Sequence, residues 1–374
     1  MTRTLDALRE LGEEGIAPRL QEAGVAGAGG GGFPTYVKWR RIDEANHLLV
    51  NHQESEPNCY MDKWLGREYP ERLADLFDAL LDVTLDTVVI GAKHSKREPW
   101  LLPLEEATDG TVYEPDELPV DPEEESGVVF AYTEDKYEYG MENILLQTVA
   151  DTILGKDLPI DYGWIVQNTE TIYNIWRAIV EEEPVTHKFV HVDGFRSDGE
   201  RIRHRMLEVP IGTPAMTLLE AAGIGPDELA DDRVLADGGP GWCFRAQRPP
   251  SRLGIRKRTN CILVLGEETV EEHTYGNDRI NVLEPFDWSH GDPDTEPSRT
   301  VLPGRANVPI MTNDNYGDLI APSEPVVNLG DEVARGDPLA EPVEDGFSVY
   351  HHSPLHGEVT DVTPYEIEVR HTGH

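Results

Sequence analysis

The chain has 374 residues, a length that allows two or three domains with full hydrophobic cores. Asp and Glu number 71 against 32 Lys and Arg, so the formal net charge at pH 7 is -39. This acidity argues against general binding to nucleic acids or anionic membranes, because both are negatively charged themselves. Apolar residues still make up 39% of the chain and fall in patterned segments, so we predict a folded, halophilic type of protein with a strongly hydrated acidic surface.

No stretch approaches the roughly 18 apolar residues of a membrane-spanning helix. The charged, amphipathic N-terminus shows no signal-peptide core. We therefore expect a cytoplasmic protein, either free or peripheral to a membrane complex. The cysteines Cys59, Cys243 and Cys261 form no C-x-x-C pair, so we expect neither a disulfide framework nor a metal site.

The first half of the chain alternates helical and strand-like segments, which predicts an α/β domain over residues 1–190. Apolar residues at helical spacing predict a helix over Asp6–Ala23, and the glycine-rich stretch Gly24–Trp39 follows it. The acidic, Pro-rich residues 103–126 predict an exposed loop. The other expected elements are strands at Leu48–Val50, Thr87–Ala92 and Gly127–Tyr132, a strand end within Asp161–Asn168, and helices at Leu73–Leu85, Asn143–Ala150 and Glu170–Val180.

The second half of the chain has a different pattern. Residues 191–265 predict a compact α+β module with one small helix at Thr217–Ala222. Residues 266–320 contain a run rich in Pro, Asp and Ser and predict an irregular linker. Residues 321–374 hold short strand-like runs separated by turn residues, which predict a small all-β domain.

The glycine-rich stretch is the first segment of the chain that indicates a ligand-binding site. Gly27 and Gly29–Gly32 carry no Cβ atom, so the backbone there can turn tightly and approach a bound group closely. Successive free N–H groups in such a loop can form a concavity that binds an anion such as phosphate. A flexible linker would also be rich in glycine. However, the continuation through Phe33 to Lys38 and Trp39 is an apolar and cationic cluster that linkers seldom carry.

Three further motifs follow this loop along the chain. They contain Asn51, Glu54, Glu56 and Pro57 within NHQESEPNCYMD, then Gly140 and Glu142 before a predicted helix, then Asn168 and Thr171. In this combination the chain resembles the flavin-bearing, NADH-oxidising subunit of respiratory complex I and the C subunit of the Rnf ferredoxin:NAD oxidoreductase. It most closely resembles the cobalamin-reductase flavoproteins of propanediol use.

The resemblance implies a fold for nearly the whole chain. Residues 1–190 would form an α/β, Rossmann-like domain of the complex I type that binds FMN and NADH. Asp193–Pro240, which contains VLADGGP, resembles a ligand-binding β-grasp (SLBB) module, here placed at residues 191–265. The VNLGDEVARGDPLAEP and HHSPLHGEV runs resemble a barrel-sandwich hybrid domain at residues 321–374. Without a Met-Lys-Met hairpin, we expect no attached lipoyl or biotinyl group.

The resemblance also implies roles for single residues, although it assigns no certain catalytic residue. Gly29–Gly32 would approach the FMN phosphate. Lys38 or Lys93 would place a positive charge near the phosphate or the reducible edge of the flavin ring. The other expected contacts are Asn51 and Asn168 to ribityl hydroxyls or ring edges, Thr171 to the phosphate, Phe33 to nicotinamide or adenine, and Glu56 and Glu142 to dinucleotide hydroxyls. Gly27, Glu54 and Gly140 complete the predicted set.

Each of these residues also has a simpler interpretation. Lys38 and Lys93 could be solvated, and Phe33 could be a core residue. Asn168 could belong to a turn, and the glutamates could be ordinary surface charges in an acidic chain. Only the joint pattern favours binding.

The largest departure from the family is the missing iron–sulfur module. Relatives carry cysteine quartets after the SLBB module, whereas Asp287–Ser298 contains no cysteine. We therefore expect FMN as cofactor, NAD(P)H as substrate and no iron–sulfur cluster in this chain. Electrons that leave singly would then need a separate redox partner, either a ferredoxin-like protein or an iron–sulfur subunit.

We accordingly predict an enzyme, an NAD(P)H-oxidising flavoprotein that passes electrons to a separate partner. Arg245–Arg258 holds six basic residues and no acid, so it is a candidate docking surface for that partner. The other interpretation of this segment is that it neutralises the protein's own acidic surface. Alternative functions are a corrinoid or quinone reductase, or a non-catalytic structural subunit of a redox complex.

Overall fold

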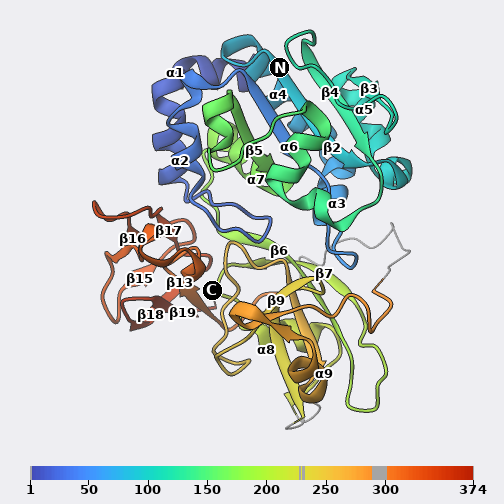
Figure 1. Ribbon diagram of the computed structural model, residues 1–374. Coiled ribbons are helices and arrows are strands. Elements are labelled where there is room, and N and C mark those ends of the chain that lie inside the picture. Colours follow the sequence, from blue (N-terminus) through green and yellow to red (C-terminus); the bar gives the residue numbers. More distant parts are fainter. Residues whose placement is uncertain (1, 227–228, 230–231, 289–300, 374) are drawn as a thin grey trace. The chain divides into compact units, whose positions relative to one another are not determined.

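The computed structural model describes residues 2–226, 229, 232–288 and 301–373. The chain divides into two compact units (Figure 1). Unit 1 comprises Met1–Gly27, Pro34–Ser55 and Tyr60–Pro184. Unit 2 comprises Ala28–Phe33, Glu56–Cys59 and Val185–His374. Most of the glycine-rich loop therefore belongs to unit 2, although the chain on either side of it belongs to unit 1.

Unit 1 is built on a parallel sheet, which in the described residues has the strand order β3-β4-β2-β1-β5. Its strands are β1 (His47–Asn51), β2 (Thr87–Lys93), β3 (Thr111–Tyr113), β4 (Gly127–Thr133) and β5 (Trp164–Asn168). All residues of β2 are buried, as is typical of a parallel strand that is covered on both faces. The α/β architecture predicted for this half of the chain is confirmed.

Helices precede, connect and follow these strands along the chain, and they pack against the sheet (Figure 1). They are α1 (Thr2–Glu22), α2 (Thr35–Trp39), α3 (Met61–Glu68), α4 (Pro70–Val83), α5 (Leu102–Thr108), α6 (Glu142–Ala150) and α7 (Thr169–Trp176). On one face, Leu145 and Val149 of α6 join Leu49 and Val89 of the sheet in a single buried cluster. None of the helices in the described part of the chain combines the length and the apolar composition that crossing a bilayer requires.

The prediction of an exposed loop over residues 103–126 is wrong in part. Its first residues lie in α5, and β3 follows at one edge of the sheet. Apolar residues within the acidic run explain the difference, because Leu104 and Val120 are both buried. Their contribution to the core outweighs the polar composition of the segment.

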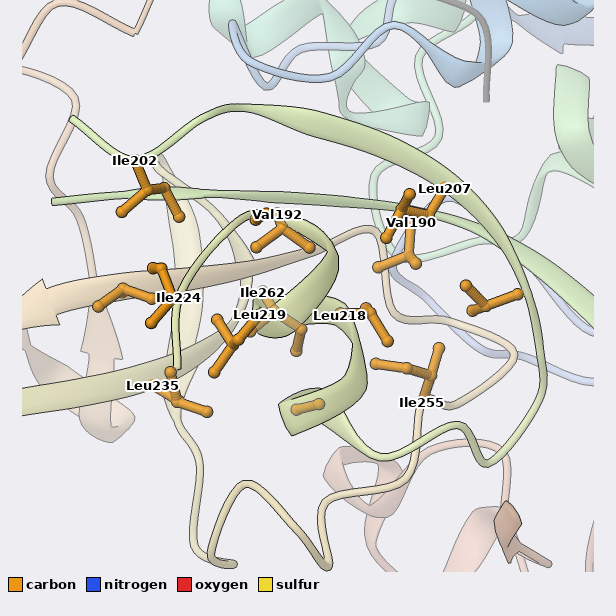
Figure 2. Close-up of a cluster of buried hydrophobic side chains, with 14 residues drawn as sticks. Val190, Val192, Ile202, Leu207, Leu218, Leu219, Ile224, Leu235, Ile255 and Ile262 are labelled. Atoms are coloured by element: carbon orange, nitrogen blue, oxygen red, sulfur yellow. The ribbon is translucent and has the colours of Figure 1, made fainter. Parts of the chain in front are cut away.

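Unit 2 contains a mixed sheet with the order β11-β12-β9-β8-β10-β6-β7. Its strands are β6 (His187–Gly194), β7 (Arg205–Pro210), β8 (Arg233–Gly239), β9 (Trp242–Arg245), β10 (Cys261–Gly266), β11 (Thr274–Tyr275) and β12 (Arg279–Ile280). Helix α8 (Ala215–Ala221) places Leu218 and Leu219 against Val190, Val192 and Ile262 of this sheet, as Figure 2 shows. This apolar cluster forms the core of the module.

The C-terminal part of unit 2 consists of short antiparallel strands. One sheet has the order β13-β19-β18-β15 and another the order β14-β16-β17. The strands are β13 (Arg305–Pro309), β14 (Glu324–Pro325), β15 (Glu332–Val333), β16 (Pro338–Glu341), β17 (His351–His352), β18 (Gly357–Val362) and β19 (Glu366–His371). The expected short strands of residues 321–374 are present.

The stretch expected to be an irregular linker contains regular structure. Helix α9 (Glu267–Glu272), the hairpin of β11 and β12, and β13 all lie within residues 266–320. These elements are too short to give a clear periodic signal in the sequence, and β13 is stabilised by pairing with the distant strand β19. Most of Asp287–Ser298 lies outside the described residues, so the expectation for that run stays a prediction.

Candidate functional site

Polar side chains meet at the C-terminal edge of the parallel sheet in unit 1. Asn51, Lys93 and Asn168 are the last residues of β1, β2 and β5. The chain leaves β1 toward β2 on one side, while β5 lies on the other side. Asn51 and Asn168 are direct register partners at this point. In open α/β sheets, ligands bind outside the carboxyl ends of the strands where the strand order reverses in this way.

Asn51 joins two of the predicted motifs. Its Nδ2 donates to the carbonyl of Gly140 at 2.9 Å, and its Oδ1 accepts from the Gln53 N–H at 3.2 Å. A Cβ atom on Gly140 would lie 1.7 Å from Ser55 Oγ. The loop after β1 and the turn before α6 can therefore approach this closely only because residue 140 is glycine.

Both predicted lysines have carboxylate partners within unit 1. Lys38 Nζ lies 2.7 Å from Glu142 and also donates to the Val166 carbonyl at 2.9 Å. Lys93 Nζ lies 2.9 Å from Asp135. The predicted residues Lys38 and Glu142 are thus brought together. However, the positive charge of each lysine is already balanced by a neighbouring acid.

The Glu54 carboxylate is directed at the first turn of α3. It accepts from the N–H groups of Asp62 and Lys63 at 3.2 and 3.3 Å. It also forms an ion pair with Lys63 Nζ at 3.3 Å, and the two side chains are only 4% and 8% exposed. These contacts make Glu54 a helix cap and half of a buried ion pair. A role in ligand binding stays a prediction.

Asp62 is a residue of this edge that the sequence motifs did not single out. Its Oδ1 accepts from the Glu170 N–H in the first turn of α7 at 2.8 Å, and its carboxylate lies 3.4 Å from Asn168 Nδ2. The hydroxyl of Thr171 donates to Asn168 Oδ1. The N-terminus of α7 therefore already holds a carboxylate, in the position that a phosphate would favour. The only signal for Asp62 in the sequence was its place in the motif NHQESEPNCYMD.

His52 is a second residue that the motifs did not single out. Burial, together with the positive charge of Lys63, lowers its pKa to about 3. Its Nδ1 lies 2.6 Å from the Thr169 hydroxyl. The imidazole is therefore neutral at physiological pH and contributes hydrogen bonding rather than charge to the end of β1.

The glycine loop in unit 2 adopts conformations that require glycine. Gly30 and Gly32 have φ angles of +94° and +62°, and a Cβ on Gly32 would lie 2.7 Å from the Thr312 carbonyl oxygen. Asn313 Nδ2 donates to the Gly31 carbonyl at 2.6 Å. With its amide oriented to match its neighbours, Asn260 donates to the Ala28 carbonyl at 2.6 Å and accepts from the Gly30 N–H at 3.3 Å.

The remaining amide groups of this loop fit an anion. In the described part of the chain, the N–H groups of Gly29, Gly31 and Gly32 donate to no protein acceptor. Gly29 and Gly31 are exposed to solvent, whereas Gly32 is buried. A run of unpaired backbone donors without Cβ atoms is the arrangement that binds phosphate in other glycine loops. The loop therefore fits the phosphate group expected from the sequence.

Phe33 and Glu56 make contacts inside unit 2. The Phe33 ring meets the rings of Tyr316 and Phe347 edge-on, with centroid distances of 5.7 and 5.8 Å. Glu56 Oε2 accepts from the Gly241 N–H at 2.8 Å. Phe33 is half-buried, so it packs against these rings without being a fully buried core residue. Stacking of Phe33 on nicotinamide and bonding of Glu56 to a dinucleotide stay predictions.

The basic segment Arg245–Arg258 is paired with acids of unit 2. The ion pairs are Arg245–Glu267, Arg248–Glu366, Arg252–Glu368, Arg256–Asp314 and Arg258–Asp237. Burial lowers the pKa of Lys257 to about 7. A cleft of about 840 Å³ lies along the segment, and the arginines at 245, 248, 256 and 258 are among its lining residues. The ion pairs favour the interpretation that this segment neutralises neighbouring acids.

Residues 20–177 match the family model described as the Nuo51 FMN-binding domain. The chain is 28% identical over 262 residues to the C subunit of the ion-translocating oxidoreductase complex of Vibrio cholerae, covering 68% of this chain and 30% of the relative. It is 29% identical over 256 residues to the cobalamin reductase PduS of Citrobacter freundii, covering 67% and 49%. The resemblance predicted from the motifs is confirmed.

The matched region spans less than two thirds of each of these relatives. Among solved structures, the crystal structure of an NAD+-reducing [NiFe]-hydrogenase in the H2-reduced state aligns with a TM-score of 0.51 at 19% sequence identity. That alignment covers 70% of this chain and 50% of the hydrogenase chain. At this level of identity the match supports a shared fold.

Proposed function

We propose that this chain, whose residues 20–177 match an FMN-binding domain, is an FMN-dependent oxidoreductase that oxidises NAD(P)H and delivers electrons to a separate acceptor. The observation that carries the proposal is the glycine loop, where the N–H groups of Gly29, Gly31 and Gly32 donate to no acceptor among the described residues. The named relatives, an oxidoreductase subunit and a reductase, support the reaction class. FMN supplies the ability to accept two electrons as hydride and return them singly.

The contacts of unit 1 favour the glycine loop as the phosphate-binding element. The alternative position is the N-terminus of α7, but Asp62 already accepts a bond there from the Glu170 N–H. A phosphate beside that carboxylate would meet like charge, which costs free energy at short range. At the glycine loop, the N–H groups of Gly29 and Gly31 have no competing protein acceptor among the described residues. Flavin or nicotinamide contacts of Lys38, Asn51, Lys93, Glu142 and Asn168 stay predictions.

The flavin proposal predicts a yellow protein. After refolding in molar potassium chloride with FMN, the purified chain should retain about one FMN per chain, and NADH or NADPH should bleach the flavin absorption. Absorption spectra recorded under anaerobic conditions measure both properties. A colourless product would contradict flavin binding. Retained flavin that neither nucleotide bleaches would favour the alternative of a non-catalytic structural subunit.

We place the docking of a redox partner at Arg245–Arg258 as a second part of this proposal. Arg245, Arg248 and Arg252 expose 43%, 45% and 51% of their side chains, so they remain accessible despite their ion pairs. This basic cluster is a local exception on a chain with a net charge of -39. It would attract an acidic ferredoxin-like protein electrostatically. The competing interpretation is charge neutralisation within unit 2, and a kinetic experiment separates the two.

Reversing the charges of Arg245, Arg248 and Arg252 to Glu should slow electron delivery to a ferredoxin roughly tenfold at low salt. Flavin reduction by NADH should keep its rate, because the docking residues do not contact the nucleotide in this proposal. Arg9→Glu is the matched control, since Arg9 on α1 is 59% exposed and also paired with an acid. Equal ferredoxin rates in the triple variant and the control would contradict docking at this segment.

The finer domain assignments belong to the same proposal. We place an SLBB β-grasp module at residues 191–265 and a barrel-sandwich hybrid domain at residues 321–374. The mixed sheet with α8 and the short antiparallel strands are compatible with these folds. A corrinoid or quinone reductase differs only in the acceptor, so assaying the reduced protein with cob(II)alamin and with a quinone tests that alternative.

A further inference from the structure

To bind an anion, the glycine loop must hold its peptide groups in one orientation. Glycine reaches positive and negative φ values with similar ease, so peptide groups flanked by glycines rotate at low cost. In this loop, a rotated peptide would present a carbonyl oxygen where an N–H is required. An oxygen directed at a phosphate repels it, so an unrestrained loop would bind an anion weakly.

Asn260 restrains the first part of the loop. It lies directly before β10 and is half-buried. Its side-chain amide donates to the Ala28 carbonyl at 2.6 Å and accepts from the Gly30 N–H at 3.3 Å. Both polar atoms of one amide are therefore used on the loop.

Asn313 restrains the second part. Its Nδ2 donates to the Gly31 carbonyl at 2.6 Å, while its Oδ1 accepts from the Asn315 N–H at 2.9 Å. The second bond fixes the orientation of the amide, and the side chain is buried. Asn313 lies between β13 and β14, so the C-terminal part of unit 2 reaches the loop through this residue.

Because the peptide groups are trans, these two contacts also fix the directions of two N–H groups. The C=O and N–H bonds of one peptide group point in opposite directions. The Ala28 carbonyl shares a peptide group with the Gly29 N–H, and the Gly31 carbonyl shares one with the Gly32 N–H. Holding each carbonyl on an asparagine therefore directs the Gly29 and Gly32 N–H groups away from that asparagine. These are two of the donors without a protein acceptor in the described part of the chain.

We infer that Asn260 and Asn313 are positioning residues that preset the Gly29 and Gly32 donors for the phosphate of the flavin. The inference rests on the proposed function. It gives the segment between β13 and β14 a role in cofactor retention, because Asn313 lies in that segment. The inference also predicts an effect on phosphate binding alone, because the two asparagines act only on the N–H donors of the loop.

The test compares FMN with riboflavin, which has the same ring and ribityl chain but no phosphate. In molar potassium chloride, Asn313→Ala and Asn260→Ala should each raise the Kd for FMN roughly tenfold, the effect of losing one well-aligned bond to a charged group. The Kd for riboflavin should stay within about twofold, because no phosphate contact is involved. Titration of the apoprotein by quenching of flavin fluorescence measures both constants.

Asn315→Ala is the matched control, because Asn315 is an exposed asparagine two residues away whose backbone N–H makes the bond to Asn313. It should change neither constant. Asn313→Ala also removes a hydrogen bond at the start of a short helical turn, so Asn260→Ala serves as the variant that leaves that turn intact. Melting temperatures of all three apoproteins identify any variant that fails to fold.

The outcomes separate this inference from the proposed function. Equal losses for FMN and riboflavin would assign the asparagines a general structural role and overturn the inference. Unchanged FMN binding in both folded variants would overturn it as well, with flavin binding itself intact. Failure of the unmodified chain to bind FMN would instead contradict the proposed function, and the inference would fall with it.

Discussion

Replacing Gly32 with alanine should raise the Kd for FMN at least about a hundredfold, because two or more charge-assisted bonds to the phosphate would be misaligned. Gly32 has a φ of +62°, and a Cβ there would lie 2.7 Å from the Thr312 carbonyl and 3.0 Å from Asn313 Cβ. A backbone oxygen cannot move aside cheaply, so the loop itself must shift. Equilibrium titration of the apoprotein with FMN measures the effect.

The chain provides a control with the same backbone strain. Gly12 in α1 also has a φ of +62°, but a Cβ there would meet no atom within 4 Å. Gly12→Ala should therefore cost about 1–2 kcal/mol of stability from the left-handed conformation alone and leave the FMN Kd unchanged. If both variants bound FMN equally well, the close packing of the glycine loop would have no role in flavin binding.

Removing the Glu54 carboxylate should lower the free energy of unfolding of unit 1 by about 3–5 kcal/mol. Glu54→Gln removes the carboxylate that pairs with the Lys63 ammonium, and the Lys63 side chain is only 8% exposed. The variant also weakens the cap of α3, because the carboxylate accepts the N–H groups of Asp62 and Lys63. Urea unfolding followed by tryptophan fluorescence measures the loss.

A double-mutant cycle tests whether the ion pair causes that loss. Lys63→Met fills similar space without charge, and Glu54→Gln/Lys63→Met should be more stable than Glu54→Gln alone by about 2 kcal/mol or more. Additive effects of the two substitutions would contradict the coupling. A variant with normal stability and weakened FMN binding would instead favour the ligand role for Glu54 that the sequence motif suggests.

The ion pairs of Lys38 and Lys93 reduce the contribution that these lysines can make to anion binding in unit 1. Lys38 lies 2.7 Å from Glu142, and Lys93 lies 2.9 Å from Asp135. A lysine in such a pair contributes less net field than a free ammonium, because the acid screens it. Backbone donors of the glycine loop are therefore the better-supported source of anion affinity, and they carry no counter-ion of their own.

The amino-acid sequence by itself predicted several strands and helices of unit 1. The apolar runs at Thr87–Ala92 and Gly127–Tyr132 predicted β2 and β4 because a buried parallel strand needs apolar residues on both faces. The glycine-rich stretch predicted an anion loop for an equally local reason, the absence of Cβ atoms. The joint motif pattern predicted the resemblance that the matches to known proteins confirm.

Only the tertiary structure decided which polar groups are already paired. Asp62 bonds Glu170 across 108 residues of sequence, and Asn313 bonds Gly31 across 282 residues. Such partners depend on strand order, register and the packing of loops, and residue type alone does not encode them. For the same reason, the sequence could identify Glu54 and Lys38 as polar residues of interest but could not show that a helix end or a neighbouring acid already holds them.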